Sequence, residues 1–352
     1  MTPDMPPEES AEAAAWDSAS IGGFVPGYPS SGLPDAQRRQ GNRGYRRVGL
    51  AVLAAVILVA LAVTAVRLGN FGGHKLTGTA NGNASRIASL AVADDDIGVS
   101  TVSFSPDGKL LASADGDGST YLWDVATHSR VATLTDPGID SSVDAAAFSP
   151  DGKLLATNDF DGSTYLWDVA THSRIATLTD PYAGNKELSA VVFSPDGNVL
   201  ATADFSGSAY LWDVATHSLT ATLTDPYAGD KVLNDVVFSP DGSLLAIVDG
   251  NGSTYLWDLA THSQIATLTD PHNNGVNAAA FSPDGKLLAT ADGSGSTYLW
   301  DLATRSRIAT MPDSDAGLQG TSTVAFSPDG KLLATGDDKG HTYLWDIAPV
   351  RV

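Results

Sequence analysis

The sequence predicts an all-β protein built from six tandem units of four strands each, and two repeated motifs carry this prediction. The pentapeptide FSPDG occurs six times, beginning at Phe104, Phe148, Phe193, Phe238, Phe281 and Phe326. The dipeptide Trp-Asp also occurs six times, beginning at Trp123, Trp167, Trp212, Trp257, Trp300 and Trp345. Both series advance in steps of 44, 45, 45, 43 and 45 residues. A fixed period of this size indicates a supersecondary unit that stacks on its neighbours.

Within each unit, turn residues separate four short runs that have strand character. The first run ends in the Phe of FSPDG, and SPDG is a turn in which Pro fixes φ and Gly accepts a positive φ. KLLATA, STYLWD and SRIATL then form the second, third and fourth runs, separated by Gly/Asp/Ser turns and by Ala-Thr-His-Ser. Aromatic and β-branched residues at alternating positions of STYLWD favour a strand. One such meander cannot bury both of its faces, so neighbouring units must pack together.

The two ends of the array predict that it closes on itself. SRIASL at residues 85–90 has the pattern of a fourth strand but precedes the first FSPDG, whereas only IAPVRV follows Asp346. The early strand therefore completes the last unit, so that six whole units close a ring through the N-terminal strand. Closure protects the sheet edges that an open array would expose.

The segment FSPDGKLLATADGSGSTYLWDLAT resembles bacterial WD-repeat (tryptophan–aspartate repeat) proteins, and the resemblance covers residues 85–348. It implies a six-bladed β-propeller, in which the four-stranded units are blades around a central channel. Small residues such as Ala145–Ala147 and Ala278–Ala280 suit first strands at the narrow inner end of a blade. The sequence contains no seventh FSPDG or Trp-Asp.

The chain departs from the family in one buried network. The resemblance implies a Gly-His pair before the first strand, whose His bonds an Asp of the second turn, a Ser/Thr of strand two and the Trp of strand three. No repeat has that pair, and the turn Asp is present only as Asp117 and Asp161. The four equivalent positions hold Ser206, Asn251, Ser294 and Lys339. We therefore expect the network to be absent and the blades to depend on apolar packing, since losing both partners of a hydrogen bond can be nearly neutral.

The residues before the repeats predict a membrane anchor. Residues 1–37 are rich in Pro, Ser, Ala and Glu, as in a disordered tail, and residues 38–47 contain five Arg. Residues 48–66 carry no charge and, as a helix, would span roughly 28 Å, which is close to the thickness of the bilayer hydrocarbon. Residues 67–84 have the composition of a flexible linker. The Arg-rich side predicts a cytoplasmic N-terminus and an extracytoplasmic propeller.

A cleaved export signal is the alternative interpretation of the same segment. Val63-Thr64-Ala65 resembles a cleavage site, and Arg46-Arg47 faintly resembles a twin-arginine signal. However, 47 residues before the apolar run are too many for the basic region of a signal, and the run itself exceeds the usual 7–15 residues. These lengths favour an uncleaved anchor.

Charge and composition exclude several partners and chemistries. The net charge of −21 lies entirely on residues 75–352, which hold 14 Lys/Arg against 35 Asp/Glu. Such a surface repels nucleic acid and anionic lipid headgroups, and it attracts basic proteins or divalent cations. The absence of Cys excludes disulfides, thiolate metal sites and a Cys nucleophile.

Two residue series resemble metal ligands. His128, His172, His217 and His262 recur in the turns between strands three and four, and Arg305 takes the fifth place. They lie in different blades, too far apart for the roughly 2.1 Å bonds of one metal, so we interpret them as a repeated turn residue.

Paired carboxylates make a second series, Asp115/Asp117 and Asp159/Asp161, in two of the Gly-rich turns. Oxygen ligands at this spacing leave a weak possibility of calcium, although no bidentate Glu follows and Asx turns explain the same residues. We expect no resident cofactor otherwise.

No enzyme motif is present: the sequence lacks G-x-S-x-G, a phosphate-binding loop, H-E-x-x-H and G-x-G-x-x-G opening a helix. The alternative is a ligand-sensing or Tol-like accessory propeller, or a hydrolytic one, because Tol-system and prolyl-peptidase propellers share S-P-D-G-K turns. Their third strands resemble I-Y-V-M-D rather than Y-L-W-D, and a peptidase needs a hydrolase domain for which no residues remain.

The predicted functional surface is the face that carries the loops from strand four to strand one and the turns between strands two and three. These loops differ among repeats while the frame stays constant, and they carry aromatic residues that are typical anchors of protein contacts. The candidate residues are Phe160, Tyr182, Phe205, Tyr227 and His272. The sequence thus predicts a membrane-tethered propeller that binds unknown protein partners as a scaffold and is not an enzyme.

Overall fold

The computed structural model describes Leu90 and residues 99–116, 118–136, 142–159, 162–179, 188–224, 232–272, 274–312, 320–337 and 341–350. The chain divides into two compact units, residues 1–40 and residues 41–352, and every described residue belongs to the second. The predicted tail, the apolar span at 48–66 and the linker lie outside the described residues. Among the residues that are described, no helix combines the length and the apolar content needed to cross a bilayer.

The described residues form six antiparallel sheets with the predicted repeat. Five sheets have four strands in sequential order, and the sixth, β21-β22-β23, has three. The first strands are β1 (Val99–Phe104), β5 (Val143–Phe148), β9 (Leu188–Phe193), β13 (Leu233–Phe238), β17 (Val276–Phe281) and β21 (Thr321–Phe326). The second strands are β2 (Leu110–Asp115), β6 (Leu154–Asp159), β10 (Val199–Asp204), β14 (Leu244–Asp249), β18 (Leu287–Asp292) and β22 (Leu332–Asp337).

The third and fourth strands complete each blade. The third strands are β3 (Ser119–Asp124), β7 (Ser163–Asp168), β11 (Ser208–Asp213), β15 (Ser253–Asp258), β19 (Ser296–Asp301) and β23 (Thr342–Asp346). The fourth strands are β4 (Ser129–Thr135), β8 (Ser173–Thr179), β12 (Ser218–Thr224), β16 (Ser263–Thr269) and β20 (Ser306–Pro312), and a 3₁₀ turn, η1 (Ala348–Val350), follows β23.

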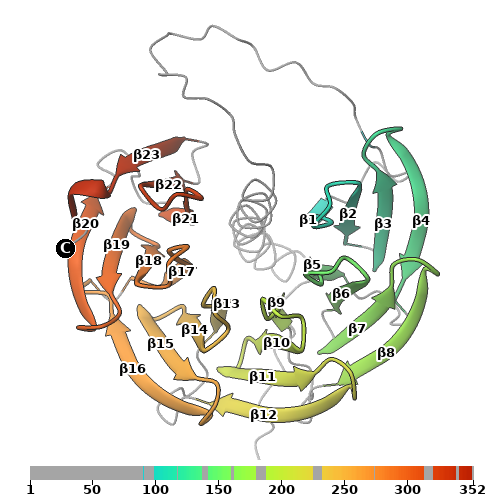
Figure 1. The fold of residues 1–352 in the computed structure, drawn as a ribbon, viewed down its shortest axis with the longest axis horizontal. Helices are drawn as coiled ribbons and strands as arrows, with labels where there is room; N and C mark the ends of the chain where they lie inside the picture. The colour runs from blue at the N-terminus through green and yellow to red at the C-terminus, as the bar shows by residue number, and fades with distance from the viewer. Residues whose placement is uncertain are drawn as a thin grey trace, which may run out of the picture. The chain divides into compact units, whose positions relative to one another are not determined.

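The six sheets stand side by side around a common centre, as Figure 1 shows. The first strands lie innermost and the fourth strands outermost, and each first strand contacts the next one in sequence from β1 to β21. The two ends of the series, β1–β4 and β21–β23, lie apart in this view. Of the predicted closing strand, only Leu90 is described, so closure through residues 85–90 is not tested by the described strands.

The hydrophobic core lies between neighbouring sheets. At the junction of the fourth and fifth blades, Leu256 and Leu268 pack with Leu288, Tyr298 and Trp300 in one buried cluster. The same repeat positions form the clusters of the other described junctions. Each sheet is therefore stabilised by the sheet beside it, as expected for a unit whose two faces are both apolar.

The SPDG turns hold the first two strands together through a local hydrogen-bond bracket. In the first blade the Ser105 hydroxyl donates to Asp107 (2.7 Å) and accepts from the Leu110 amide (2.9 Å). The glycine that ends this turn, Gly108, has φ of 71°, a left-handed conformation that costs glycine little. The same bracket recurs in all six turns, which explains why this tetrapeptide is repeated without change.

The His of the family network is absent, as the sequence indicates, but the expectation that the blades depend on apolar packing alone was wrong. Five Trp indoles donate to a strand-two hydroxyl, as Trp167 does to Thr157 at 3.0 Å. The Tyr of STYLWD makes a second, separate buried bond, since Tyr165 donates to Asp159 at 2.8 Å. Equivalent Tyr–Asp bonds of 2.9–3.3 Å occur in the third to sixth blades.

The Asp of these bonds lies two residues earlier in the chain than the turn position predicted from the family pattern. The residue that accepts these bonds is the last of strand two, which is Asp in all six blades: Asp115, Asp159, Asp204, Asp249, Asp292 and Asp337. These side chains are all buried, and each also accepts a bond from the backbone amide of the residue four places later, which opens strand three in the first five blades and precedes it in the sixth. A buried carboxylate therefore has the partners that burial requires.

Candidate binding face

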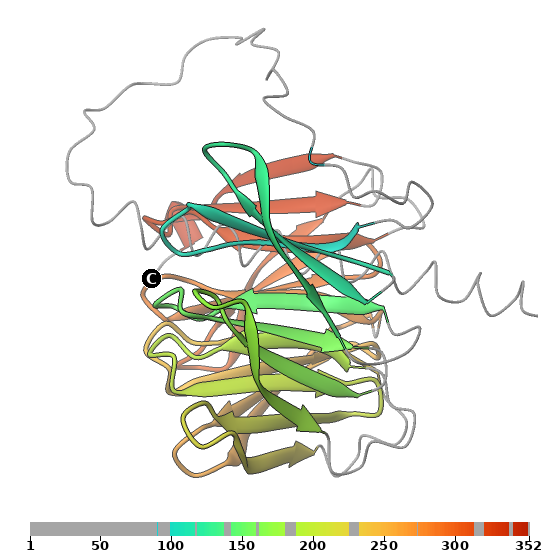
Figure 2. The same cartoon turned by 90° about the vertical axis from the view of Figure 1, so that its right-hand side faces the viewer.

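The turns between strands two and three and the ends of the loops from strand four to strand one lie on the same face. In the fourth blade the Gly250 amide, directly after β14, donates to the Val232 carbonyl before β13 at 2.9 Å. In the fifth blade Gly293 and Gly275 make the same bond at 2.8 Å. Figure 2 shows the strands running between this face and the opposite one.

Two of the five predicted face residues belong to the described part of the chain. Phe205 lies in the turn between β10 and β11 and is half-buried. His272 follows β16, and its side chain is 60% exposed. Phe160, Tyr182 and Tyr227 lie outside the described residues. The structure thus places Phe205 in a turn between strands two and three and His272 in a loop that follows a fourth strand. The two residues lie in different blades, and His272 lies against the fifth blade.

The opposite face carries the repeated His residues, and their backbone conformation explains why His recurs there. His128, His172, His217 and His262 have φ of 51–58°, and Arg305 has φ of 56°. In the first of these turns the Asp124 carboxylate accepts bonds from the amide and hydroxyl of Thr127, which lower the pKa of Asp124. His tolerates the left-handed conformation better than most residues do. Within the described residues, these His side chains form no group with metal-binding geometry.

Pairs of carboxylates meet where one blade adjoins the next, an arrangement that sequence reasoning missed. Asp270 follows the fourth strand of blade four, and Asp292 ends the second strand of blade five. Asp136 and Asp159 are the corresponding residues of blades one and two. In the sequence, the recurring Thr-Asp-Pro after strand four was the available signal, but only packing shows that it faces the next blade.

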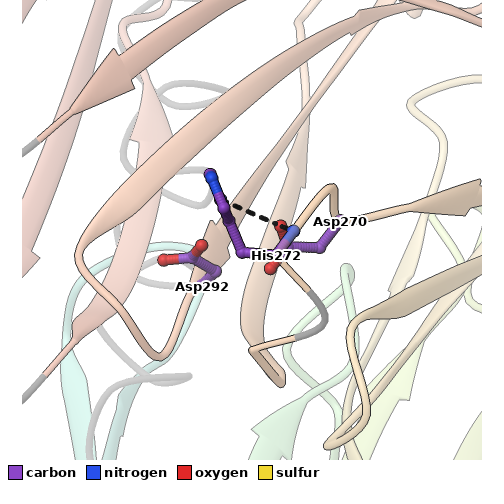
Figure 3. Close-up of side chains that lie close together, drawn as sticks. All are labelled: Asp270, His272 and Asp292. Carbon is purple, nitrogen blue, oxygen red and sulfur yellow. Dashed lines mark hydrogen bonds and ion pairs between the residues drawn. The ribbon is translucent and has the colours of Figure 1, made fainter.

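His272 joins the carboxylates at the junction of blades four and five, shown in Figure 3. Ligand atoms of Asp270, His272 and Asp292 all lie within 4.8 Å of one another. His272 Nδ1 lies 2.9 Å from the hydroxyl of Tyr298, which donates to Asp292 at 3.1 Å. The Arg307 guanidinium stacks over the Tyr298 ring, 5.4 Å from its centre. Burial, and also the charge of Asp270, raises the pKa of Asp292.

The two members of this pair differ in how their oxygens are satisfied. Asp292 accepts bonds from Ser294, Ser296 and Tyr298. Asp270 accepts a bond from the His272 amide at 2.8 Å through one oxygen, but its buried second oxygen has no hydrogen-bond partner. Such an atom is costly in an apolar interior unless a cation or a proton compensates it.

The first junction has a similar pair but no His. Asp136 is buried, and neither of its carboxylate oxygens has a hydrogen bond of normal geometry. Burial and the nearby charge of Asp159 raise the pKa of Asp136 to about 7, against a smaller opposing effect of Arg174. The position of His272 is held by Gly138 in that loop. In the calcium candidates, Asp115 and Asp159 are buried strand-end residues, whereas Asp117 and Asp161 lie outside the described residues.

These features, six repeated antiparallel sheets around one centre with Trp and Asp at fixed places in the third strand, define a WD-repeat β-propeller. Residues 87–346, well over half of the chain, match the model of one such family, described as the IFT122 first beta-propeller, and the chain belongs to that family. The chain also resembles a chain in a crystal structure of the mitotic checkpoint complex, with a TM-score of 0.64 and 22% identity over 74% of this chain and 77% of that one. At this identity the likeness shows the fold. No curated protein matches the chain in sequence.

Proposed function

We propose that this chain is a protein-binding scaffold, a WD-repeat propeller held at a membrane by residues 48–66. The observation that carries the proposal is a constant frame, repeated six times, that presents unlike loops on one face. WD-repeat propellers are typically interaction scaffolds, and the similar crystal structure is of a multiprotein complex.

The binding face of the proposal comprises Phe160, Tyr182, Phe205, Tyr227 and His272. Exposed aromatic residues on a polar rim are frequent hot spots of protein interfaces. Because residues 75–352 carry the whole net charge of −21, a partner with a basic surface fits best.

A triple substitution tests this face. We expect Phe160→Ala, Tyr182→Ala and Phe205→Ala together to weaken partner binding at least about tenfold, since the loss of even two of the three anchors, at about 1 kcal/mol each, exceeds the roughly 1.4 kcal/mol of a tenfold change. The matched control is the triple substitution of His128, His172 and His217 by Asn on the opposite face, because Asn also accepts a positive φ. Unchanged capture by the Ala variant, or an equal loss in the control, would contradict the proposed face.

The proposed topology has the N-terminus in the cytoplasm and the propeller outside. It is supported by the five Arg residues that precede the apolar span. Protease added to intact cells should cleave the propeller or the linker at residues 67–84. Protection of both until the cells are lysed would contradict this orientation.

We further propose that residues 85–90 complete the sixth blade as its fourth strand. Leu344 in β23 is 71% exposed, whereas Leu299 at the same position of blade five is fully buried. Leu299 pairs with Ala309 of β20, and the residue that corresponds to Ala309 in SRIASL is Ala88. A strand beside β23 would also cover the unpaired edge of that sheet.

An engineered disulfide tests the closure, because the chain has no Cys of its own. Ala88→Cys with Leu344→Cys should form a disulfide rapidly, since directly opposed residues have Cβ atoms at the required separation. Ser85→Cys with Leu344→Cys is the control, because a shift of three residues moves the thiols roughly 10 Å apart. Equal cross-linking in both variants, or none in the first, would show that residues 85–90 do not occupy this edge.

A further inference from the structure

We infer that Asp270, His272 and Asp292 form a binding site for a divalent transition-metal ion, with Zn²⁺ the preferred ion. This site shares His272 with the proposed binding face, but it does not rest on the scaffold function. Within the described residues it is the group of three His or acidic side chains whose ligand atoms converge, all within 4.8 Å of one another. The residues come from two blades, and Figure 3 shows them close together at the junction.

The ligand set points to the kind of ion. One imidazole and two carboxylates suit Zn²⁺ or a neighbouring transition metal, whereas Ca²⁺ and Mg²⁺ prefer oxygen ligands alone. Three protein ligands leave at least one coordination position for water. With bonds of roughly 2.1 Å, tetrahedral ligand atoms lie about 3.4 Å apart, so separations of up to 4.8 Å must shorten by up to about 1.4 Å. The exposed ring of His272, on a loop outside the core, can make this movement.

The second oxygen of Asp270 is the independent sign of a cation. The Asp270 side chain is only 1% exposed, and this oxygen has no hydrogen-bond partner. Asp270 and Asp292 are both buried, and a ligand oxygen of each lies within 4.8 Å of the other, so two carboxylates lie close together out of contact with water. A bound cation would satisfy the unpaired oxygen and remove the repulsion, whereas hydrogen bonds within the cluster do neither.

Neighbouring side chains already orient two of the ligands. Tyr298 donates to Asp292 and contacts His272 Nδ1, while Ser294 and Ser296 also donate to Asp292. Carboxylates and imidazoles held in this way lose less freedom when a metal binds. Tyr298 must give up its contact with Nδ1, or His272 must bind through Nε2.

The other repeats supply matched controls. The position of His272 is held by Gly138 in the first loop and by Tyr182 and Tyr227 in the second and third. Since other loops of this type already have Tyr at this position, His272→Tyr should keep the fold while it removes the nitrogen ligand. Asp136→Asn changes the corresponding carboxylate at the junction that has no His.

The test is equilibrium dialysis of the metal-free full-length protein against ZnCl₂ in competition with a chelating dye, together with visible spectra of the Co²⁺ form. We expect one Zn²⁺ per chain that resists the dye, and a Co²⁺ spectrum of four- or five-coordination. His272→Tyr and Asp270→Asn should each weaken binding at least about tenfold, and Asp136→Asn should leave it unchanged.

Three outcomes would overturn the site. These are the absence of a tight Zn²⁺ equivalent in the wild-type protein, unchanged affinity in His272→Tyr, or an equal loss in Asp136→Asn. In the first two cases the three residues serve only as a hydrogen-bonded link between blades. If Asp270→Asn does not fold, the decision rests on His272→Tyr, whose folding is checked by circular dichroism.

Discussion

Blades five and six contain the same pentapeptide, TYLWD, yet its side chains lie in different surroundings. In blade five Tyr298 and Leu299 are fully buried and Trp300 nearly so. In blade six Tyr343 and Trp345 are half-buried, and Leu344 is 71% exposed. Two differences account for this: Leu299 packs in one buried cluster with residues of blade six, and β19 lies between β18 and β20, whereas β23 is the last described strand of its sheet. Burial in a propeller therefore belongs to the position of a blade in the ring as much as to its sequence.

The largest expected effect comes from truncating the buried Leu of blade five. Leu299→Ala should lower the free energy of unfolding by about 2–5 kcal/mol, since it removes a large side chain from a packed core. Leu344→Ala in the full chain sharpens the comparison. If residues 85–90 cover β23 as we propose, its cost should exceed about 1.5 kcal/mol. A cost below about 0.5 kcal/mol, typical of exposed sites, would mean that blade six stays open. Urea unfolding measures both.

The second prediction compares first strands. Asp235 in β13 occupies the position of Ala278 in blade five, and burial raises its pKa to about 7. Because this folded-state pKa lies above the unfolded value of 3.8, ionisation opposes folding, and stability is lost as the pH rises from about 4 to about 7. Asp235→Asn should be stabilising, with an advantage that grows by roughly 2–3 kcal/mol between pH 5 and pH 8.

Asparagine is chosen because its carbonyl can still accept the bond that the Ala279 amide gives to Asp235 at 3.2 Å. Thermal unfolding of both proteins across this pH range measures the effect. An advantage that does not change with pH would show that Asp235 keeps an ordinary pKa, and the difference between the two first strands would then be steric only.

The smallest expected effect concerns the Tyr–Asp bonds. Tyr298→Phe removes a bond to a buried carboxylate and should destabilise the protein by roughly 1–2 kcal/mol. Tyr343→Phe removes the longer bond of blade six, 3.3 Å, beside a half-exposed ring that water can reach. The cost of Tyr343→Phe should stay below about 1 kcal/mol if blade six is uncovered, and should approach that of Tyr298→Phe if residues 85–90 cover it as we propose. Equal costs in urea unfolding would show that the sixth blade is as tightly covered as the fifth.

Much of the architecture was predictable because its signals are local and repeated. The periods of FSPDG and Trp-Asp predicted the number of units, and the spacing of turn residues within KLLATADGSGSTYLWD predicted the strands, which the structure confirms. The structure also places the predicted turn residues His128, His172, His217 and His262 in left-handed positions, which depend on neighbouring residues alone.

The buried polar bonds were mispredicted because they depend on how the antiparallel strands pair as well as on the sequence. Asp292 and Tyr298 are six residues apart on antiparallel strands, and only their pairing shows that the hydroxyl reaches the carboxylate. The family's His and turn Asp give no signal for a Tyr that donates to the Asp at the end of strand two.

By itself, then, the sequence determined the repeat, the strands, the turns and the family of this protein, because each depends on contacts within some 45 residues. Only the tertiary structure decided which carboxylates lie together at a junction between blades. It also decided which leucine of the repeated pentapeptide is exposed to solvent. Asp270 lies close to Asp292 because blade four packs against blade five. Leu299 is buried and Leu344 is not, because only Leu299 packs against a neighbouring described blade. No local pattern encodes such contacts, because identical repeats acquire different neighbours only when the ring assembles.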